Sequence, residues 1–385
     1  MATAPLPRPT IWQLSKKQID ATLGKLGHRL NKPLVGEEIV LTPTPTDTRW
    51  PVPANAAALP PAFLEGLAHI LAEVQPNNLR QMLYHLADAS VAWHGTVVKG
   101  TRVFVPSLPY PRLEMEFAGT FLLRQLRRHR PVVLQAGPVG LAFDSWSGNY
   151  FHWMAEVLPR LLVLRQAQPD CVVLLPGLTP PDYVRQTVAA LGFKYTYALT
   201  PGELVAVPDL WVAALPGRTG YILPELVREG RATIIAYLSA GFYPARQATR
   251  RLYVSRRRQQ WRQLTNEEAV EAILVRYGFE TIYFEDMTFA QQVQTMYEAA
   301  VFIGIHGANM TNVHFMTPGT HAIEMMSNTY LNPSYLAMAD SLGVNYWLVP
   351  SMLGSPPEVQ HNYADITADL VLVEQVVRKV CGGDS

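Results

Sequence analysis

The sequence is poor in cysteine and lacks a long hydrophobic run. Cys171 and Cys381 are its two cysteines, and they lie far apart in a chain of 385 residues. This excludes a disulfide framework and argues against a structural zinc site, and it is typical of a reducing cytosol. No apolar segment reaches the roughly 18 residues that a membrane-spanning helix needs. The first residues, Met1–Thr10, also lack the pattern of a signal peptide.

Charged residues are scarce as well, at 16% of the chain, and the formal net charge is +1. Because nucleic acids and membrane surfaces attract proteins through a strong positive field, we expect neither as a general partner. The sequence therefore predicts a cytoplasmic protein, with peripheral contact at the inner face of the membrane through a partner or a lipid-linked substrate. Hydrophobic residues, at 49%, predict a well-buried core.

Several motifs of nucleotide-handling and hydrolytic enzymes are absent. The sequence contains no Asp-x-Asp metal anchor, and the nearest pattern is Glu114-x-Glu116. It also lacks the G-x-S-x-G nucleophile elbow, the P-loop and the G-x-G-x-x-G fingerprint. A site for a metal ion or a dinucleotide is therefore not expected from motifs.

The length predicts two domains. In the first part, residues 32–62 are Pro-rich, and we expect helices over 62–74 and 115–128 and a strand pair around 91–106. From Pro131 onwards strands and helices alternate. Strands are expected over 132–134 and 171–175, and helices over 149–166 and 181–191.

The alternation is clearest from Arg250 onwards. Strands are expected over 251–255, 281–284, 301–305, 321–325 and 346–349, and helices over 265–278, 288–300 and 332–342. Capping boxes at Thr265/Glu268 and Thr288/Gln291 mark two helix starts. Repeated βαβ units predict a parallel, doubly wound sheet. A last helix, over 366–380, is a candidate to cross back to the first domain.

A glycine-containing segment, Gly304–Asn312, directly follows the strand expected over 301–305. Gly304 and Gly307 let the backbone turn sharply and approach a ligand. The next helix offers free N–H groups at the sheet edge where ligands of such folds bind. The segment is a candidate diphosphate site, and a plain strand-to-helix turn is the alternative.

Two further features are expected at the same sheet edge. Arg256 belongs to an arginine cluster and follows a strand, and arginine binds phosphate oxygens through paired hydrogen bonds. Glu324 ends another strand, where a carboxylate can accept hydrogen bonds from ribose hydroxyls. The alternatives are a solvated basic loop and a surface Glu. The cluster comprises Arg250, Arg251, Arg256, Arg257, Arg258 and Arg262.

The segment Asp144–Arg160 carries the candidate catalytic residues of the first half. On a helix, His152 and Glu156 share a face, and histidine is a natural general base near neutral pH. A core helix with a buried His is the alternative, whereas a zinc site lacks a third ligand. The aromatic residues expected to stack against a sugar are Tyr150, Phe151 and Trp153.

Together these blocks resemble glycosyltransferase family 61 over about residues 140–350. The family pattern is N-Y-x-H-W-x-x-(E/D)-x-L-P-R, a strand ending in Ser-Arg, R-x-x-x-N-E-E, an acidic-x-x-S/T-x-x-x-Q stretch, I-G-x-H-G-A-x-x-T-N, and a strand ending in Glu. The corresponding residues are Asn149–Arg160, Ser255–Arg256, Arg262–Glu268, Glu285–Gln292, Ile303–Asn312 and Glu324. Glu156 is a departure, because eukaryotic members often have Asp there, and residues 1–130 are divergent.

The resemblance implies a GT-B architecture, with two Rossmann-like domains facing each other across a cleft. It implies inverting transfer from a UDP-sugar without a metal ion, to a glycan or lipid-linked glycan acceptor. The missing signal anchor resembles bacterial relatives, which are assigned to capsule or other surface polysaccharides. We expect an acceptor-side domain over 1–240, a nucleotide-sugar domain over 241–362, and a C-terminal helix over 363–385.

The residues and the resemblance together predict three groups of site residues. The base is expected to be His152, followed in preference by Glu156 and Asp144. The donor-binding residues are Ser255, Arg256, Arg262, Asn266, Gly304, His306, Gly307, Ala308, Asn309, Thr311, Asn312 and Glu324. The acceptor-side or sugar-side residues are Asn149, Tyr150, Trp153 and Arg160.

Two other functions stay open at this point. One is a GT-B-like nucleotide-sugar epimerase, which would convert a UDP-sugar without an acceptor. The other is a non-catalytic nucleotide- or polyanion-binding module that uses the arginine cluster, with steeply salt-dependent binding. The pair of His152 and Glu156 favours an enzyme, because a binding module has no use for a base.

Overall fold

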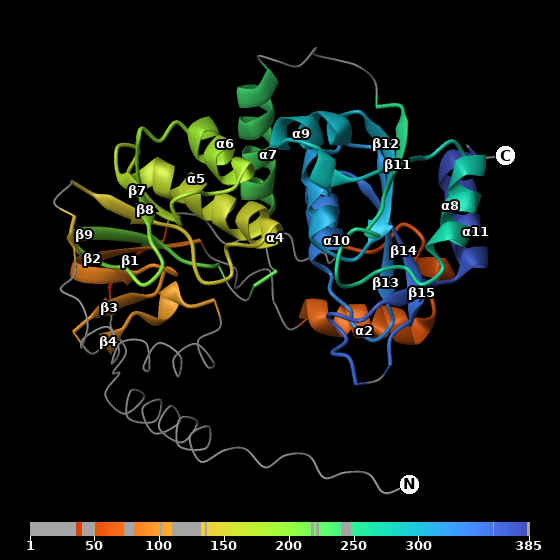
Figure 1. Cartoon of the computed structure of the whole chain (residues 1–385), viewed down its shortest axis with the longest axis horizontal. Coiled ribbons are helices and arrows are strands. Elements are labelled where there is room, and N and C mark those ends of the chain that lie inside the picture. The colour runs from red at the N-terminus through yellow and green to blue at the C-terminus, as the bar shows by residue number, and fades with distance from the viewer. Residues whose placement is uncertain are drawn as a thin grey trace, which may run out of the picture.

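Two β-sheets organise the chain in the computed structural model (Figure 1). The structure describes residues 36–40, 51–72, 81–100, 102–109, 132–134, 137–216, 219–220, 223–239, 248–356 and 358–382. Helices pack on both sheets, which confirms the predicted mixed α/β class. None of the helices in these ranges combines the length and the hydrophobicity needed to span a bilayer.

The second sheet confirms the predicted parallel arrangement. Its strand order is β11-β10-β12-β13-β14-β15, and β14 with β15 is its one antiparallel pair. The strands are β10 (Arg250–Val254), β11 (Glu280–Ile282), β12 (Ala299–Ile305), β13 (His321–Ser327), β14 (Asn345–Leu353) and β15 (Ile366–Ala368). The helices are α8 (Glu267–Arg276), α9 (Phe289–Tyr297), the 3₁₀ helix η7 (Ala308–Phe315), α10 (Ser334–Ser341) and α11 (Leu370–Cys381).

Both faces of this sheet are covered, and successive side chains along a strand enter two different hydrophobic cores. On β12, Ile303 belongs to the core formed with α8 and α11, whereas its neighbour Phe302 belongs to the core formed with α9 and α10. A period of two along a strand sends successive side chains to opposite faces. Figure 1 shows α8 and α11 on one side of the sheet, and α9 and α10 on the side towards the first sheet.

The first sheet is mixed. Its order is β4-β3-β2-β9-β6-β7-β8, with β1 on β2 and β5 on β9. Strands β9, β6, β7 and β8 are parallel, whereas β2 pairs antiparallel with β9, so only part of this sheet is parallel. The strands are β1 (Glu37–Val40), β2 (Met82–Ala92), β3 (Val97–Lys99), β4 (Arg102–Val103), β5 (Val132–Val133), β6 (Val139–Leu141), β7 (Val172–Pro176), β8 (Tyr195–Leu199) and β9 (Leu204–Ala213).

The helix predicted over 149–166 is present, but it changes type along its length. It runs from α4 (Tyr150–His152) through a π-helical segment, η4 (Trp153–Val157), into α5 (Leu158–Ala167). Single π turns inside helices are frequent at functional sites. This helix packs with α7 (Pro224–Leu238), which also contacts α10, α6 (Asp182–Ala190) and η7. Helix α7 therefore contributes to the contact between the two sheets.

Two expectations about long-range packing are wrong. The C-terminal helix α11 packs on α8 and β14 and does not cross back to the first sheet. The segment that crosses is instead 51–72, which ends in α2 (Pro61–Ala72) beside the second sheet (Figure 1). The Asn55 side-chain amide bonds both the carbonyl and the N–H of Leu348, at 2.7 and 3.0 Å. Segment 51–72, which belongs to the first expected domain (1–240), therefore contacts the second sheet.

Of the two predicted capping boxes, one is confirmed and the other is wrong. The box at Thr288 and Gln291 is confirmed. The box at Thr265 is wrong, because the N-cap of α8 is Asn266 and the Thr265 hydroxyl pairs with Thr367 on β15. The helix predicted over 115–128 and the Glu114-x-Glu116 pattern lie outside the described residues.

Candidate active site

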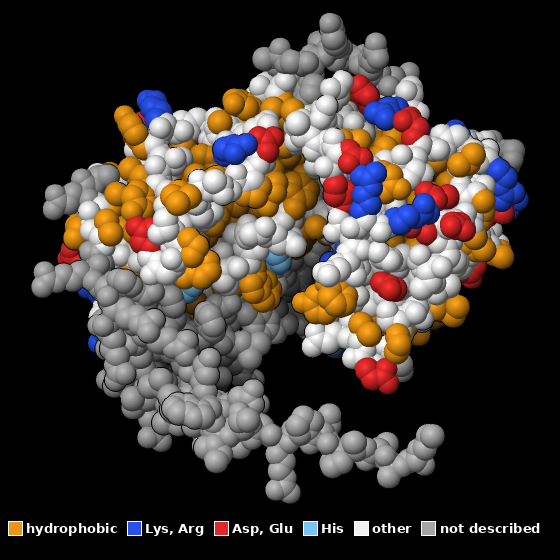
Figure 2. Space-filling view, viewed as in Figure 1, with side chains coloured by type: hydrophobic (Ala, Val, Ile, Leu, Met, Phe, Trp, Pro, Cys, Tyr) orange, Lys and Arg blue, Asp and Glu red, His pale blue; other side chains and the backbone are white. Residues whose placement is uncertain are grey.

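A cavity of about 370 Å³ lies where α4 meets the carboxyl edge of the second sheet. Figure 2 shows a hollow between the two halves, with a histidine side chain and a Lys or Arg side chain visible inside it. We call the cavity the His152 cavity. Its lining residues are Trp146, Asn149, Phe151, His152, Thr219, Gly220, Arg262, His306, Ala308, Tyr330, Asn332, Tyr335, Asn362 and Tyr363.

His152 and Glu156 form a hydrogen-bonded pair at this cavity, as their spacing on the helix predicted. His152 Nδ1 lies 2.9 Å from Glu156 Oε2, and the carboxylate is buried while the imidazole is 20% exposed. The other oxygen, Oε1, accepts hydrogen bonds from the Thr219 hydroxyl and the Gly220 N–H, at 2.5 and 2.8 Å. Both oxygens of a buried carboxylate are therefore satisfied, which keeps it in one orientation.

The protonation of the pair follows from this environment. Burial by itself would raise the pKa of the Glu156 carboxyl, but hydrogen bonds from His152 and Thr219 hold that pKa below its usual range. An ionised carboxylate only accepts hydrogen bonds, so the His152 Nδ1 carries the hydrogen. The Nε2 atom is then the nitrogen with a lone pair, able to take a proton.

Asp144, the third candidate base, has a different role in the structure. Its side chain is buried and bonded to the Arg160 guanidinium at 2.9 Å, and it also accepts from the Trp146 N–H and the Ser147 hydroxyl. The expectation that Arg160 lies on the sugar side is therefore wrong, since its side chain is 4% exposed and neutralises Asp144. This buried ion pair fixes the loop that carries Trp146.

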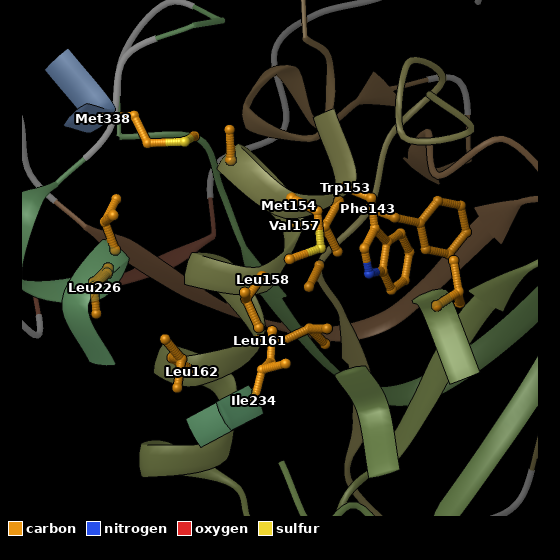
Figure 3. Packing of buried hydrophobic residues seen from close by; sticks show 14 of the residues in the cluster. Phe143, Trp153, Met154, Val157, Leu158, Leu161, Leu162, Leu226, Ile234 and Met338 are labelled. Atoms are coloured by element: carbon orange, nitrogen blue, oxygen red, sulfur yellow. The ribbon is translucent and has the colours of Figure 1, made fainter. Parts of the chain in front are cut away.

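Trp153, Tyr150 and Asn149 of the same block lie in three different places. Trp153 is 1% exposed and packs beside Phe143 in the core, with its indole N–H donating to Thr187, so the sugar-stacking role expected for it is wrong (Figure 3). The Tyr150 hydroxyl donates to Asn312 of η7 at 2.7 Å, which joins the two halves. Asn149 caps α4 through its bond from the Phe151 N–H and lines the His152 cavity.

The glycine loop of the second sheet lies against Arg256. An added Cβ at Gly307 would lie 2.7 Å from Arg256 Nη1, so a larger residue there would displace the Arg256 guanidinium. Arg256 is buried and donates to the carbonyls of Arg262 and Trp261. Burial and the neighbouring Arg262 lower the pKa of Arg256 to about 10, so it stays charged at neutral pH.

Arg262 is the arginine that lines the His152 cavity. Its backbone φ is +58°. This left-handed conformation is energetically unfavourable for any residue other than glycine. The Arg262 Nε is buried with no hydrogen-bond partner among the described residues, and Nη1 lies 3.4 Å from the His306 carbonyl. A strained backbone that holds an under-bonded guanidinium at a cavity wall indicates a site for an anion.

A second histidine–carboxylate pair lies on this side of the cavity. His306 Nδ1 is hydrogen-bonded to Glu324, whose side chain is fully buried. Burial raises the pKa of Glu324 above its usual range, although His306 and Arg262 act in the opposite direction. Glu324 lies behind His306, so the expected contact with ribose hydroxyls is not available to it. Its role is to orient the imidazole that lines the cavity.

Most other residues expected to bind the donor support the loop from behind. The Ser255 hydroxyl donates to the buried Glu267, and Gly304 packs against Val254 and Met310. Asn266 does not line the His152 cavity, and its side-chain amide pairs with the backbone of Ala368 on β15. A contact between Asn266 and a donor stays a prediction. Thr311 is buried in η7.

A separate cavity of about 360 Å³ lies on the other side of Ala308. We call it the Asn309 cavity. Asn309 Nδ2 is buried without a partner among the described residues, and Ala308 lines both cavities. The cavity lies between α6 and α9. Its lining residues are Tyr150, Asp182, Tyr183, Gln259, Phe284, Glu285, Met287, Thr288, Phe289, Gln292, Ala308, Asn309 and Asn312.

Sequence reasoning missed Thr219 and Gly220, although they bind the catalytic candidate Glu156 directly. They lie more than 60 positions from Glu156 in the sequence, and no helical or strand periodicity connects them. The one local signal is Gly220 itself, whose φ of +88° marks a turn that favours glycine. In the described part of the chain, no group of three or more His, Cys, Asp or Glu side chains is placed to hold a metal ion.

The sequence of the chain is similar to one protein family. A family model described as Glycosyltransferase 61 matches residues 150–323. The matched range includes His152, Glu156, Arg262 and His306, and it ends one position before Glu324. No curated protein matches the chain.

Replacing Arg262 by glycine tests whether its guanidinium is held for a ligand. Arg262→Gly keeps the left-handed backbone without strain, so the unfolding free energy should stay within about 1 kcal/mol of wild type. The affinity for UDP, measured by calorimetry, should fall roughly tenfold to hundredfold, because a charged hydrogen bond is lost. Arg276→Ala, which removes an exposed charge on α8, is the matched control. Normal UDP affinity in Arg262→Gly would contradict the ligand role.

Proposed function

We propose that this chain, which belongs to glycosyltransferase family 61, transfers a sugar from a UDP-sugar to a hydroxyl of a glycan, with inversion and without a metal ion. One observation supports the proposal most strongly. The His152 cavity combines a histidine–carboxylate base on one side with Arg262 and His306 on the other. A displacement needs a proton acceptor and a charge-stabilising group in one site.

The arrangement of the two sheets also agrees with the GT-B architecture that we propose. The candidate base comes from a helix of the first sheet, and the cationic residues come from the carboxyl edge of the second. In open α/β sheets, ligands bind at that edge. A role in surface polysaccharide synthesis is part of the same proposal and follows from the family resemblance.

In the proposed mechanism, the acceptor hydroxyl attacks the anomeric carbon directly. As the new C–O bond forms, the bond to the diphosphate oxygen breaks, and His152 Nε2 takes the hydroxyl proton. The ionised Glu156 stabilises the imidazolium that results, since its carboxylate accepts the Nδ1–H. Thr219 and Gly220 keep this carboxylate in place during the step.

The leaving UDP develops negative charge on its outer phosphate. We propose that Arg262, His306 and the free N–H groups of Ala308 and Asn309 at the start of η7 stabilise that charge. One such donor contributes roughly 3 kcal/mol to the transition state in other enzymes. Arg256 adds a buried positive charge beneath Gly307 and holds the loop in shape.

We propose that the donor binds across both cavities on either side of Ala308, with its nucleoside in one and its sugar in the other. The nucleoside fits the Asn309 cavity, where the buried Asn309 Nδ2 has no partner among the described residues. The sugar fits the His152 cavity, next to the base. The diphosphate then passes the N–H of Ala308, the residue that lines both.

Variants of the base and its carboxylate separate catalysis from binding. His152→Ala and Glu156→Gln should lower kcat by about 10²–10⁴-fold and leave UDP affinity within twofold. Exposed His69→Ala is the control. Wild-type turnover in His152→Ala would remove this residue as the base.

A thermal-shift panel tests the donor and the metal independence together. We expect UDP-sugars, but not GDP-, CMP- or dTDP-sugars, to raise Tm with EDTA present, by the equivalent of about 2.7 kcal/mol at a hundredfold excess over Kd. A shift that requires added Mg²⁺ or Mn²⁺ would contradict metal independence. Conversion of the UDP-sugar to an epimer without acceptor would instead favour an epimerase.

A further inference from the structure

A third cavity, of about 520 Å³, opens at the carboxyl edge of the first sheet. Residues just after β6, β7 and β8 line it together with the turn between β2 and β3. We call it the Trp93 cavity. Its lining residues are Trp93, His94, Phe143, Asp144, Ser145, Trp146, Gly148, Pro176, Gly177 and Pro201. None of the residues assigned above to the donor lines it, so this cavity is available for another part of the reaction.

Trp146 connects this cavity to the proposed base. It lines both the Trp93 cavity and the His152 cavity, and its ring lies 5.3 Å from that of His152 between centroids. The Trp146 backbone is held by Asp144, which is itself fixed by Arg160. A molecule that extends from the Trp93 cavity over Trp146 would therefore place its end next to His152.

The lining of the Trp93 cavity suits an uncharged, partly apolar ligand. Half of its lining residues are aromatic or proline, and Trp93 is 36% exposed, so part of its ring is accessible to a ligand. None of the described lining residues is Lys or Arg, and the charge of Asp144 is neutralised by Arg160. Among the described lining residues, a phosphate group or an acidic sugar would therefore find no Lys or Arg as a counter-ion.

We propose that the Trp93 cavity binds the neutral sugar units of the acceptor that precede the attacking hydroxyl. A sugar ring has an apolar C–H face that can stack on Trp93 and a hydroxyl edge that can bond to polar groups such as Ser145. The volume lies in the range of sites for ligands larger than one sugar ring. The acceptor is then a saccharide of at least two units, which runs from Trp93 over Trp146 to His152.

This inference rests on the proposed function, because it assumes that an acceptor is glycosylated at His152. It adds the class of acceptor and the residues that select it. The sequence-based choice of Trp153 as a sugar platform is replaced by Trp93 and Trp146. Trp93 follows β2 and lies in the strand pair expected around 91–106, to which no role in the active site was given. Trp146 lies within the segment Asp144–Arg160, which carries the candidate catalytic residues.

Binding to an array of neutral and acidic oligosaccharides tests the proposal with the full chain saturated with UDP. Wild type should retain neutral glycans of two or more units. Trp93→Ala should weaken that retention roughly tenfold, Trp93→Phe should keep most of it, and Tyr237→Ala, which removes an exposed ring on α7, should not change it. The Trp93→Phe variant keeps the aromatic ring, so the proposal can still be tested if Trp93→Ala does not fold.

Three results would overturn the inference. These are retention of acidic glycans alone, retention of neutral glycans that is indifferent to Trp93→Ala, and no glycan retained by the wild type. UDP-sugar binding by thermal shift, measured on the same samples, separates this failure from that of the proposed function. If the UDP-sugar shift persists while glycan binding fails, only the acceptor site is wrong. If no nucleotide sugar binds, the proposed function fails first.

Discussion

A single buried carboxylate, that of Glu156, joins the parts of the chain on which the candidate active site depends. Its two oxygens bond an imidazole on the same helix and a turn from a distant loop, so the position of His152 is set by the fold and not by solvent. Because a buried ionised group must be fully paired, Thr219 and Gly220 are required neighbours. The base is thus preorganised before any substrate arrives.

Much of the second sheet could be predicted from the sequence, because its signals are local. The continuous apolar run of the strand expected over 301–305, and the glycines of the following turn, are readable without tertiary contacts. The pairing of His152 with Glu156 also follows from helical spacing alone. These features concern residues that are near one another in the chain.

Other features could not be predicted, because they depend on pairs that are far apart in the sequence. Asp144 was expected as a candidate base and Arg160 as a sugar-side residue, but each neutralises the other in a buried pair. Glu324 was expected to face a ribose, but only the tertiary structure shows His306 in front of it. Likewise, nothing local indicates that the segment around Asn55 crosses to β14.

A base and a leaving-group site that face each other across the His152 cavity allow one displacement at the anomeric carbon. The anomeric configuration of the first product, followed by proton NMR during turnover, tests this arrangement most directly. We expect inversion, with an α-linked UDP-sugar giving a β-linked glycoside. A product that retains the donor's configuration would contradict it.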